Sequence, residues 1–268
     1  METILICIIA GLGAGLGTGF AGMSAAVVIS PMLVTFLGVN PYEAIGIALA
    51  SDVLASGVSA FTYAKNKNID IKRSKSLFIS VLIFTGIGAL VAQQVPVATM
   101  GNLTVYGSLL MGINFFMKSF KKEEITEATE IQEQPQDNLA EAKTFKQKIR
   151  PFLPVLCGSL IGFICGFIGA GGGIMMLILL TTVLNYELKT AVGTSVFIMT
   201  FTALFGATSH FTLQRIMPDP MILSLCALST LTFALLGAKF ANKAQAHVLN
   251  RATGIVLMSL GTFMILAV

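Results

Sequence analysis

The stretch Gly158–Gly173, GSLIGFICGFIGAGGG, guides the interpretation of the rest of this sequence. A shift of 147 positions towards the N-terminus places Gly11–Gly22, GLGAGLGTGFAG, on it without a gap. Ten of the 38 positions from 11 to 48 are identical to their counterparts under this shift, whereas an apolar-biased composition alone gives about a third of that number. The pairs include Gly11/Gly158, Gly15/Gly162, Gly19/Gly166, Phe20/Phe167 and Gly22/Gly169. The sequence therefore predicts a duplicated unit that opens with a glycine-rich segment, a frequent plan in membrane transporters.

The composition indicates a membrane protein. The chain is 55% hydrophobic and 11% charged, and its mean hydropathy is +0.84. Soluble domains carry about a quarter charged residues, so this chain cannot cover itself with polar surface. We predict an all-α integral membrane protein, a polytopic helical bundle. The net charge of +4 does not indicate nucleic acid as a partner, because basic residues beside apolar segments set membrane topology.

About eight hydrophobic segments follow one another in two sets of four. They cover residues 4–37, 44–64, 77–95 and 97–117, then 152–184, 190–211, 221–240 and 248–268. The first segment of each set exceeds the roughly 20 residues of one span. Its glycines fit either a broken or re-entrant helix or a straight helix that packs closely. We expect a first transmembrane repeat at 1–117, a hydrophilic cytoplasmic linker at 118–150 and a second transmembrane repeat at 151–268.

Basic residues constrain the topology of these segments. The clusters at 65–75 and 239–251 and both ends of the linker should face the cytoplasm. Eight simple crossings would place the cluster at 239–251 outside. The conflict disappears when each long glycine segment enters and leaves on the same side, because each set then has three further crossings and the two repeats become inverted. We favour this inverted arrangement, in which both termini lie outside.

Asp52 is the one acidic residue well inside an apolar segment. It lies about ten residues into that segment, or roughly 15 Å along a helix. Helical spacing places Ser56 and Ser59 on the same face. A carboxylate at this depth is costly and indicates a proton relay, a coupling-ion site or a partner for a cation; the alternative is a protonated structural aspartate. Its counterpart in the second repeat is Met199, so the predicted coupling role belongs to one repeat only.

The two glycine segments are candidate anion sites. A broken helix in a membrane must be buried or line a cavity, and the N-terminus of its second half attracts anions through free N–H groups. The alternative is close helix packing by small residues. The candidate substrate-binding residues are Gly19, Gly22, Met23, Ser24, Ser51, Gly169, Gly171, Gly172, Gly173, Thr194 and Ser195. Cys165 is a further candidate, and His210, which ends its segment, is expected at the membrane interface.

No motif indicates an enzyme. HExxH and GxSxG are absent, and the only histidines are His210 and His247. We therefore predict no catalytic residues, no metal ligands and no cofactor. A transporter of another solute class, such as a metal ion or an amino acid, and a non-transport membrane scaffold remain alternatives. The metal ion is disfavoured because the apolar segments contain few acids and histidines.

Several motifs together resemble the TauE/SafE family of membrane anion exporters, also called the sulfite exporter family. They are GLGAGLGTGFAG with NPYEAIGIALASD, GFICGFIGAGGG with NYELKTAVGTSV, the link YAKNKNIDIKRS, and the closing LLGAKFANKAQAHVLNRATGIVLMSLGTFMIL. The resemblance covers nearly the whole chain except the linker. It implies secondary transport of a small anion, such as sulfite or an organosulfonate, across the inner (cytoplasmic) membrane, with coupling to protons. Residues 23–26, MSAA, differ from residues 170–173, AGGG, so the two sites should differ.

Overall fold

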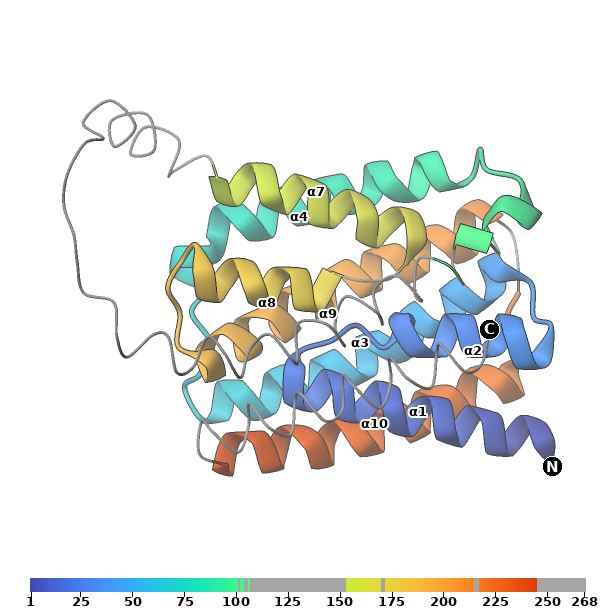
Figure 1. Cartoon of the computed structure of the whole chain (residues 1–268), viewed down its shortest axis with the longest axis horizontal. Helices are drawn as coiled ribbons and strands as arrows, with labels where there is room; N and C mark the ends of the chain where they lie inside the picture. Colours follow the sequence, from blue (N-terminus) through green and yellow to red (C-terminus); the bar gives the residue numbers. More distant parts are fainter. Residues whose placement is uncertain (101, 104–105, 107–152, 170–171, 215–216, 245–268) are drawn as a thin grey trace.

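The computed structural model describes residues 1–100, 102–103, 106, 153–169, 172–214 and 217–244. The expected linker and the last apolar segment lie outside the described residues, as does most of the segment 97–117. The helices are α1 (Glu2–Ala21), α2 (Ala26–Leu37), α3 (Pro41–Lys65), α4 (Ile71–Ala92), α7 (Leu153–Ile168), α8 (Gly172–Thr182), α9 (Leu188–Gln214) and α10 (Pro220–Lys243). They lie along a common direction in one bundle (Figure 1). Within the described part, five helices (α1, α3, α4, α9 and α10) are long and apolar enough to cross a membrane, which confirms the polytopic helical class.

Both long glycine segments are broken helices. Gly22 ends α1 in the left-handed conformation, with φ 62°, and its N–H donates to the carbonyl oxygen of Thr18 at 3.0 Å. Gly169, its counterpart, follows α7 with φ 73°. Glycine adopts this conformation without the penalty that a Cβ atom brings, which is why both breaks fall on glycine. Beyond each break the chain turns back, so that α1–α2 and α7–α8 are hairpins (Figure 1).

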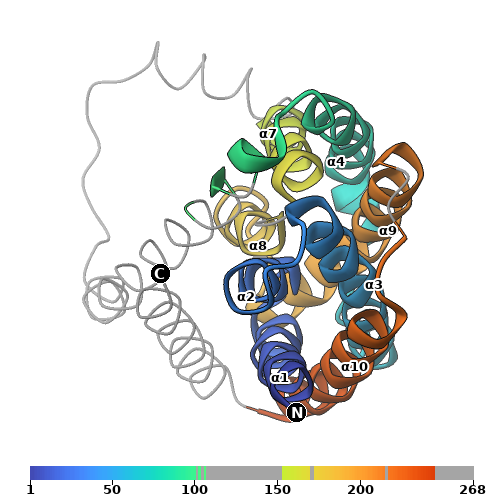
Figure 2. The same cartoon turned by 90° about the vertical axis from the view of Figure 1, so that its right-hand side faces the viewer.

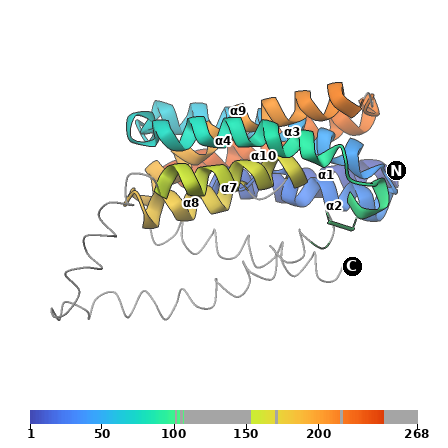
Figure 3. The same cartoon turned by 90° about the horizontal axis from the view of Figure 1, so that it is seen from above.

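The two halves run in opposite directions. The counterparts α3 and α9 pack side by side. Gly46, near the start of α3, lies against Phe211 near the end of α9, and Gly193, near the start of α9, lies against Tyr63 near the end of α3. The two helices are therefore antiparallel. Figure 3 shows α2 near the end of the bundle that holds the N-terminus and α8 near the opposite end. This is the geometry that the inverted arrangement requires.

The repeated glycines inside α1 and α7 are packing surfaces. α1 lies along α10 and α7 lies along α4, as the view down the bundle shows (Figure 2). At four of these glycines, an added Cβ atom would collide first with a backbone atom of the neighbouring helix, so the two backbones touch directly. The pairs are Gly15–Thr230, Gly19–Ala234, Gly162–Val81 and Gly166–Thr85. The close-packing interpretation therefore holds for the glycines within the helices, and the broken-helix interpretation holds for Gly22 and Gly169.

The two ends of the bundle differ in the charge of their side chains. The end where α3 leads into α4 is basic: Arg73 Nη2 donates to the carbonyl oxygen of Leu184 at 2.8 Å, and Lys189 Nζ donates to that of Asn242 at 3.1 Å. At the opposite end, the backbone N–H of Asp219 donates to Glu43 Oε1 at 2.9 Å. The described charged residues of the basic end are Lys65, Lys67, Asp70, Lys72, Arg73, Lys75, Glu187, Lys189, Lys239 and Lys243; those of the acidic end are Glu2, Glu43 and Asp219. The N-terminus lies at the acidic end (Figure 1), and the positive-inside rule predicts that the basic end faces the cytoplasm.

Candidate functional site

The two helix breaks face one another inside the bundle. A Cβ atom on Gly173, in the first turn of α8, would collide with the carbonyl oxygen of Gly22. Each break also packs on the third helix of the other repeat. Gly22 lies against Val192 of α9, and Gly169 lies against Ile45 of α3; these two partners are counterparts in the duplication. The starts of the half-helices α2 and α8 therefore come together where the repeats meet.

The start of α2 holds the carboxylate of Asp52. Ser24 Oγ donates to Asp52 Oδ2 at 2.7 Å, and the backbone amide of Ala25 also interacts with this carboxyl group. Asp52 is 1% exposed, and its Oδ1 has no hydrogen-bond partner within the described part of the chain. A helix N-terminus attracts an anion through its free N–H groups and its dipole. In the first repeat, the group at this position is the carboxyl group of Asp52.

The start of α8 has a different environment. Met199, the counterpart of Asp52, places its sulfur beside Gly173. The thiol of Cys165 interacts with the backbone amide of Gly172 and with the side chain of Thr202. It also lies within range of an electrostatic interaction with Asp52. Cys165 and Thr202 are both buried. The described residues around this second helix start thus offer sulfur atoms, a hydroxyl and backbone N–H groups, and no carboxylate in direct contact.

Three other candidate residues also lie at or beside the first break. Ser195 Oγ donates to the carbonyl oxygen of Val192 at 2.8 Å and lies against Gly22. Met23 is buried within the break. Ser51, next to Asp52 in sequence, is buried and donates to the carbonyl oxygen of Ile47 at 2.8 Å, so its hydroxyl is satisfied by its own helix.

Two candidates have other roles, and one lies outside the described residues. Gly19 packs against α10, as described above. Thr194 Oγ1 accepts a hydrogen bond from the backbone N–H of Asp70 at 3.0 Å and thereby holds the link between α3 and α4 at the basic end. Gly171 is not among the described residues. The structure therefore brings Gly22, Met23, Ser24, Asp52, Gly172, Gly173 and Ser195 together and does not bring Gly19 or Thr194 to them. Ser51 is next to Asp52 in α3, and Gly169 lies at the second break against Ile45.

Sequence reasoning missed Thr202 and did not indicate the burial of His210. Thr202 follows Met199 by three residues, so the duplication combined with helical spacing could have indicated it. His210 is 3% exposed, and its Nε2 lies 3.3 Å from the carbonyl oxygen of Gly166. The carbonyl groups that end α7 lack helix partners, which gives a buried imidazole a polar neighbour there. Among the described residues, no group of three or more His, Cys, Asp or Glu side chains could hold a metal ion.

Broken helices that bring their half-helix ends together inside a membrane bundle are typical of helical membrane transporters. Lipid tolerates interrupted backbone only where protein or a water-filled path covers it. The comparison with known families gives the particular one. The model of the family described as "Sulfite exporter TauE/SafE" matches residues 7–264. The chain therefore belongs to this family, which confirms the resemblance seen in its motifs.

Named relatives agree with this assignment. The chain is 29% identical over 217 residues to the probable membrane transporter protein MJ0441 of Methanocaldococcus jannaschii, covering 77% of this chain and 72% of that protein. It is 26% identical over 216 residues to the probable membrane transporter protein YunE of Bacillus subtilis, covering 78% of each. A shorter match, 48% identical over 59 residues, joins 22% of this chain to 24% of the probable membrane transporter protein YdhB of Bacillus subtilis. No solved structure matches the chain.

Proposed function

We propose that this membrane transporter carries a small sulfur-containing anion, such as sulfite or an organosulfonate, across the cytoplasmic membrane, and that Asp52 couples the transport to protons. The observation that carries the proposal is the difference between the two facing helix starts. The start of α2 is occupied by the Asp52 carboxylate, whereas Met199 stands at the matching position beside α8. An external anion therefore has one helix start available to it, that of α8.

The start of α8 suits an anion that has several oxygen atoms. The first N–H groups of a helix lack partners within the helix and point out of its end. Gly172 carries no Cβ atom, so an oxyanion can approach its backbone closely, whereas the carbonyl oxygen of Gly22 and the sulfur of Met199 fill the space beside Gly173. The hydroxyl of Thr202, which donates to the carbonyl oxygen of Met199 at 3.1 Å, can turn to donate to a ligand. Sulfite and sulfonates offer three oxygen acceptors to such a set of donors.

The position of Asp52 couples this site to protonation. Its charge reaches Cys165, which contacts Gly172, so an anion at the start of α8 also lies within electrostatic reach of the carboxylate. Two negative charges repel strongly where the effective dielectric constant is low. A bound anion therefore favours protonated Asp52, and by linkage a protonated Asp52 favours the bound anion. Oδ1, which has no partner in the described part, is the atom available to take the proton.

The orientation of the chain is part of this proposal. Gly158, in the second turn of α7, packs against Ser80 and Leu77 of α4, so α7 begins near the basic end of the bundle. We infer from the positive-inside rule that this end faces the cytoplasm. We accordingly keep the division into a first transmembrane repeat at 1–117, a cytoplasmic linker and a second transmembrane repeat at 151–268.

Sulfite flux into proteoliposomes tests the proposal. The wild-type chain and the Asp52→Asn variant are compared with and without an imposed pH gradient, and Glu2→Gln, at the exposed start of α1, is the matched control. We expect saturable flux that responds to the gradient in the wild type and in Glu2→Gln, and loss of that response in Asp52→Asn. A response that persists in Asp52→Asn would overturn the coupling role. Absence of flux for sulfite and for a panel of organosulfonates would overturn the choice of substrate.

A further inference from the structure

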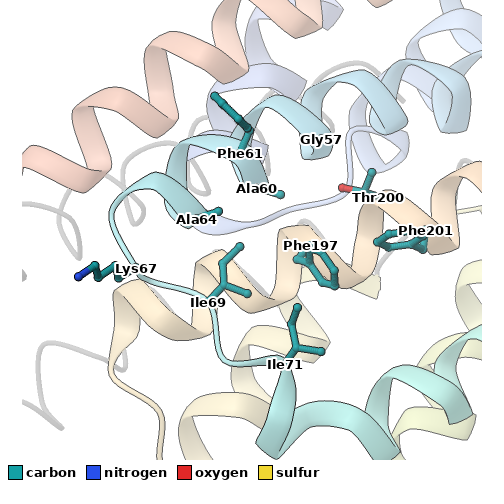
Figure 4. A pocket seen from close by; sticks show the side chains of 10 residues that line it. All are labelled: Gly57, Ala60, Phe61, Ala64, Lys67, Ile69, Ile71, Phe197, Thr200 and Phe201. Atoms are coloured by element: carbon teal, nitrogen blue, oxygen red, sulfur yellow. The ribbon is translucent and has the colours of Figure 1, made fainter.

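A hollow of about 530 Å3 lies between α3 and α9, apart from the two helix breaks (Figure 4). Its volume falls in the range of small-molecule sites, roughly 300–1,000 Å3. It is lined by Gly57, Ala60, Phe61, Ala64, Lys67, Ile69, Ile71, Phe197, Thr200 and Phe201. Phe61 is 72% exposed and Phe201 is 41% exposed, so the hollow opens on the outer face of the bundle.

The walls of the hollow are apolar and one end is basic. Three phenylalanines and two isoleucines supply most of the wall. Lys67 lies at one end, and Thr200 and Phe201 lie at the other (Figure 4). Lys67 has a left-handed backbone, with φ 59°, and its N–H donates to the carbonyl oxygen of Ala64 at 2.9 Å. The hydrogen-bonded turn that ends α3 therefore fixes the place of this cation.

We propose that this hollow binds an acyl chain of an anionic phospholipid and that Lys67 pairs with the phosphate of the same lipid. Seven of the ten lining residues belong to α3 and α9, which are long and apolar enough to span the membrane, so the exposed wall faces hydrocarbon. Lys65, Lys67 and Lys72 gather at the end of the hollow, and the nearby Asp70 caps α4 by accepting from the backbone N–H of Arg73 at 3.2 Å. This balance of charge favours an anionic headgroup over a zwitterionic one. The inference goes beyond the proposed transport function and does not depend on it.

The part of the hollow that α3 lines differs in sequence from its counterpart in the second repeat. A Cβ atom at Gly57 would meet only the Cγ2 atom of Thr200, at 3.6 Å, which leaves open space where other residues would place a side chain. The counterpart of Gly57 in the second repeat is Leu204, and the counterpart of Phe61 is Thr208. Because α3 and α9 are antiparallel, the C-terminal half of α3 lies towards the basic end, whereas the C-terminal half of α9 lies towards the opposite end. The basic end faces the cytoplasmic leaflet, where anionic lipids attract basic residues.

Two substitutions separate the two parts of the proposed site. Gly57→Leu introduces the residue of the second repeat and fills the hollow, and the open space at this position allows the variant to fold. Lys67→Asn removes the charge, and asparagine tolerates the left-handed backbone at this position. Lys239→Asn is the matched control, because Lys239 is an exposed cation at the same end of the bundle and does not line the hollow.

Native mass spectrometry of the delipidated full chain, titrated with phosphatidylglycerol or with phosphatidylcholine of the same chain length, tests the inference. We expect the wild type and Lys239→Asn to retain phosphatidylglycerol about tenfold more strongly than phosphatidylcholine. Lys67→Asn should lower phosphatidylglycerol binding to the phosphatidylcholine level, and Gly57→Leu should weaken the binding of both lipids. Equal binding of the two lipids to the wild type would overturn the role of the headgroup. Unchanged binding in Gly57→Leu would overturn the hollow as the acyl-chain site.

Discussion

Substituting alanine for Gly15 tests the contact between α1 and α10 directly. A Cβ atom at this position would lie 2.6 Å from the carbonyl oxygen of Thr230 and 2.8 Å from the backbone N of Ala234. Both neighbours are backbone atoms of a helix, so neither can move away as the end of a flexible side chain can. Gly57 is the matched control, because it also lies inside a spanning helix and an added Cβ atom has room there.

The expected difference between the two variants follows from two contributions. Alanine is favoured over glycine inside a helix by about 1 kcal/mol, and this gain is common to both substitutions. Overpacking at a tight contact costs about 1–3 kcal/mol, and it applies to Gly15→Ala alone. Gly57→Ala should therefore be more stable than the wild type by up to about 1 kcal/mol, and Gly15→Ala should be less stable than Gly57→Ala by about 1–3 kcal/mol.

Equilibrium unfolding in mixed micelles with rising dodecyl sulfate gives the free energies of unfolding of both variants. The chain contains no tryptophan, so far-ultraviolet circular dichroism is the suitable signal for loss of helix. If Gly15→Ala proves as stable as Gly57→Ala, the backbones of α1 and α10 do not touch at this point. The assignment of the repeated glycines to helix packing would then be wrong.

Three further predictions rest on single contacts. Ser24→Ala should lower the free energy of unfolding by about 1.5–3 kcal/mol, because a hydroxyl donor stabilises the charged carboxylate of Asp52. The loss should be larger at pH 9 than at pH 5, and an equal loss at both pH values would contradict this pairing. Asn40→Ala should cost about 0.5–2 kcal/mol in the same unfolding assay, since the Asn40 side chain accepts from the backbone N–H of Tyr42 at 3.0 Å and caps α3; an unchanged midpoint would show that the cap contributes nothing. In intact cells, an impermeant thiol reagent should label Asp219→Cys and leave Lys67→Cys unlabelled. Both variants are made in a parent chain whose native cysteines have been replaced, and this parent chain is the control. The reverse labelling pattern would invert the assigned orientation.

The sequence by itself determined the class of protein and the two glycine-rich segments in which a helix could break. Low charge and long apolar segments leave a helical membrane bundle as the stable outcome, because lipid offers no partners to exposed backbone groups. The gapless shift between the glycine segments predicted the duplication. Both breaks fall on glycines, Gly22 and Gly169, because left-handed backbone strongly favours this residue. Asp52 stood out because a carboxylate inside an apolar segment is costly.

Only the tertiary structure decided which groups meet. Spacing along one helix gives the face on which a residue lies and not the helix that covers this face, so Gly19 and Gly22 looked alike in the sequence. Packing made Gly19 a contact with α10, whereas Gly22 became part of the central break. The hydrogen bond between Ser24 and Asp52 spans 28 positions. The contacts of Cys165 with Gly172 and Thr202 depend on how two inverted repeats fit together. Such pairings are set by the close packing of whole helices, which no local pattern of residues encodes.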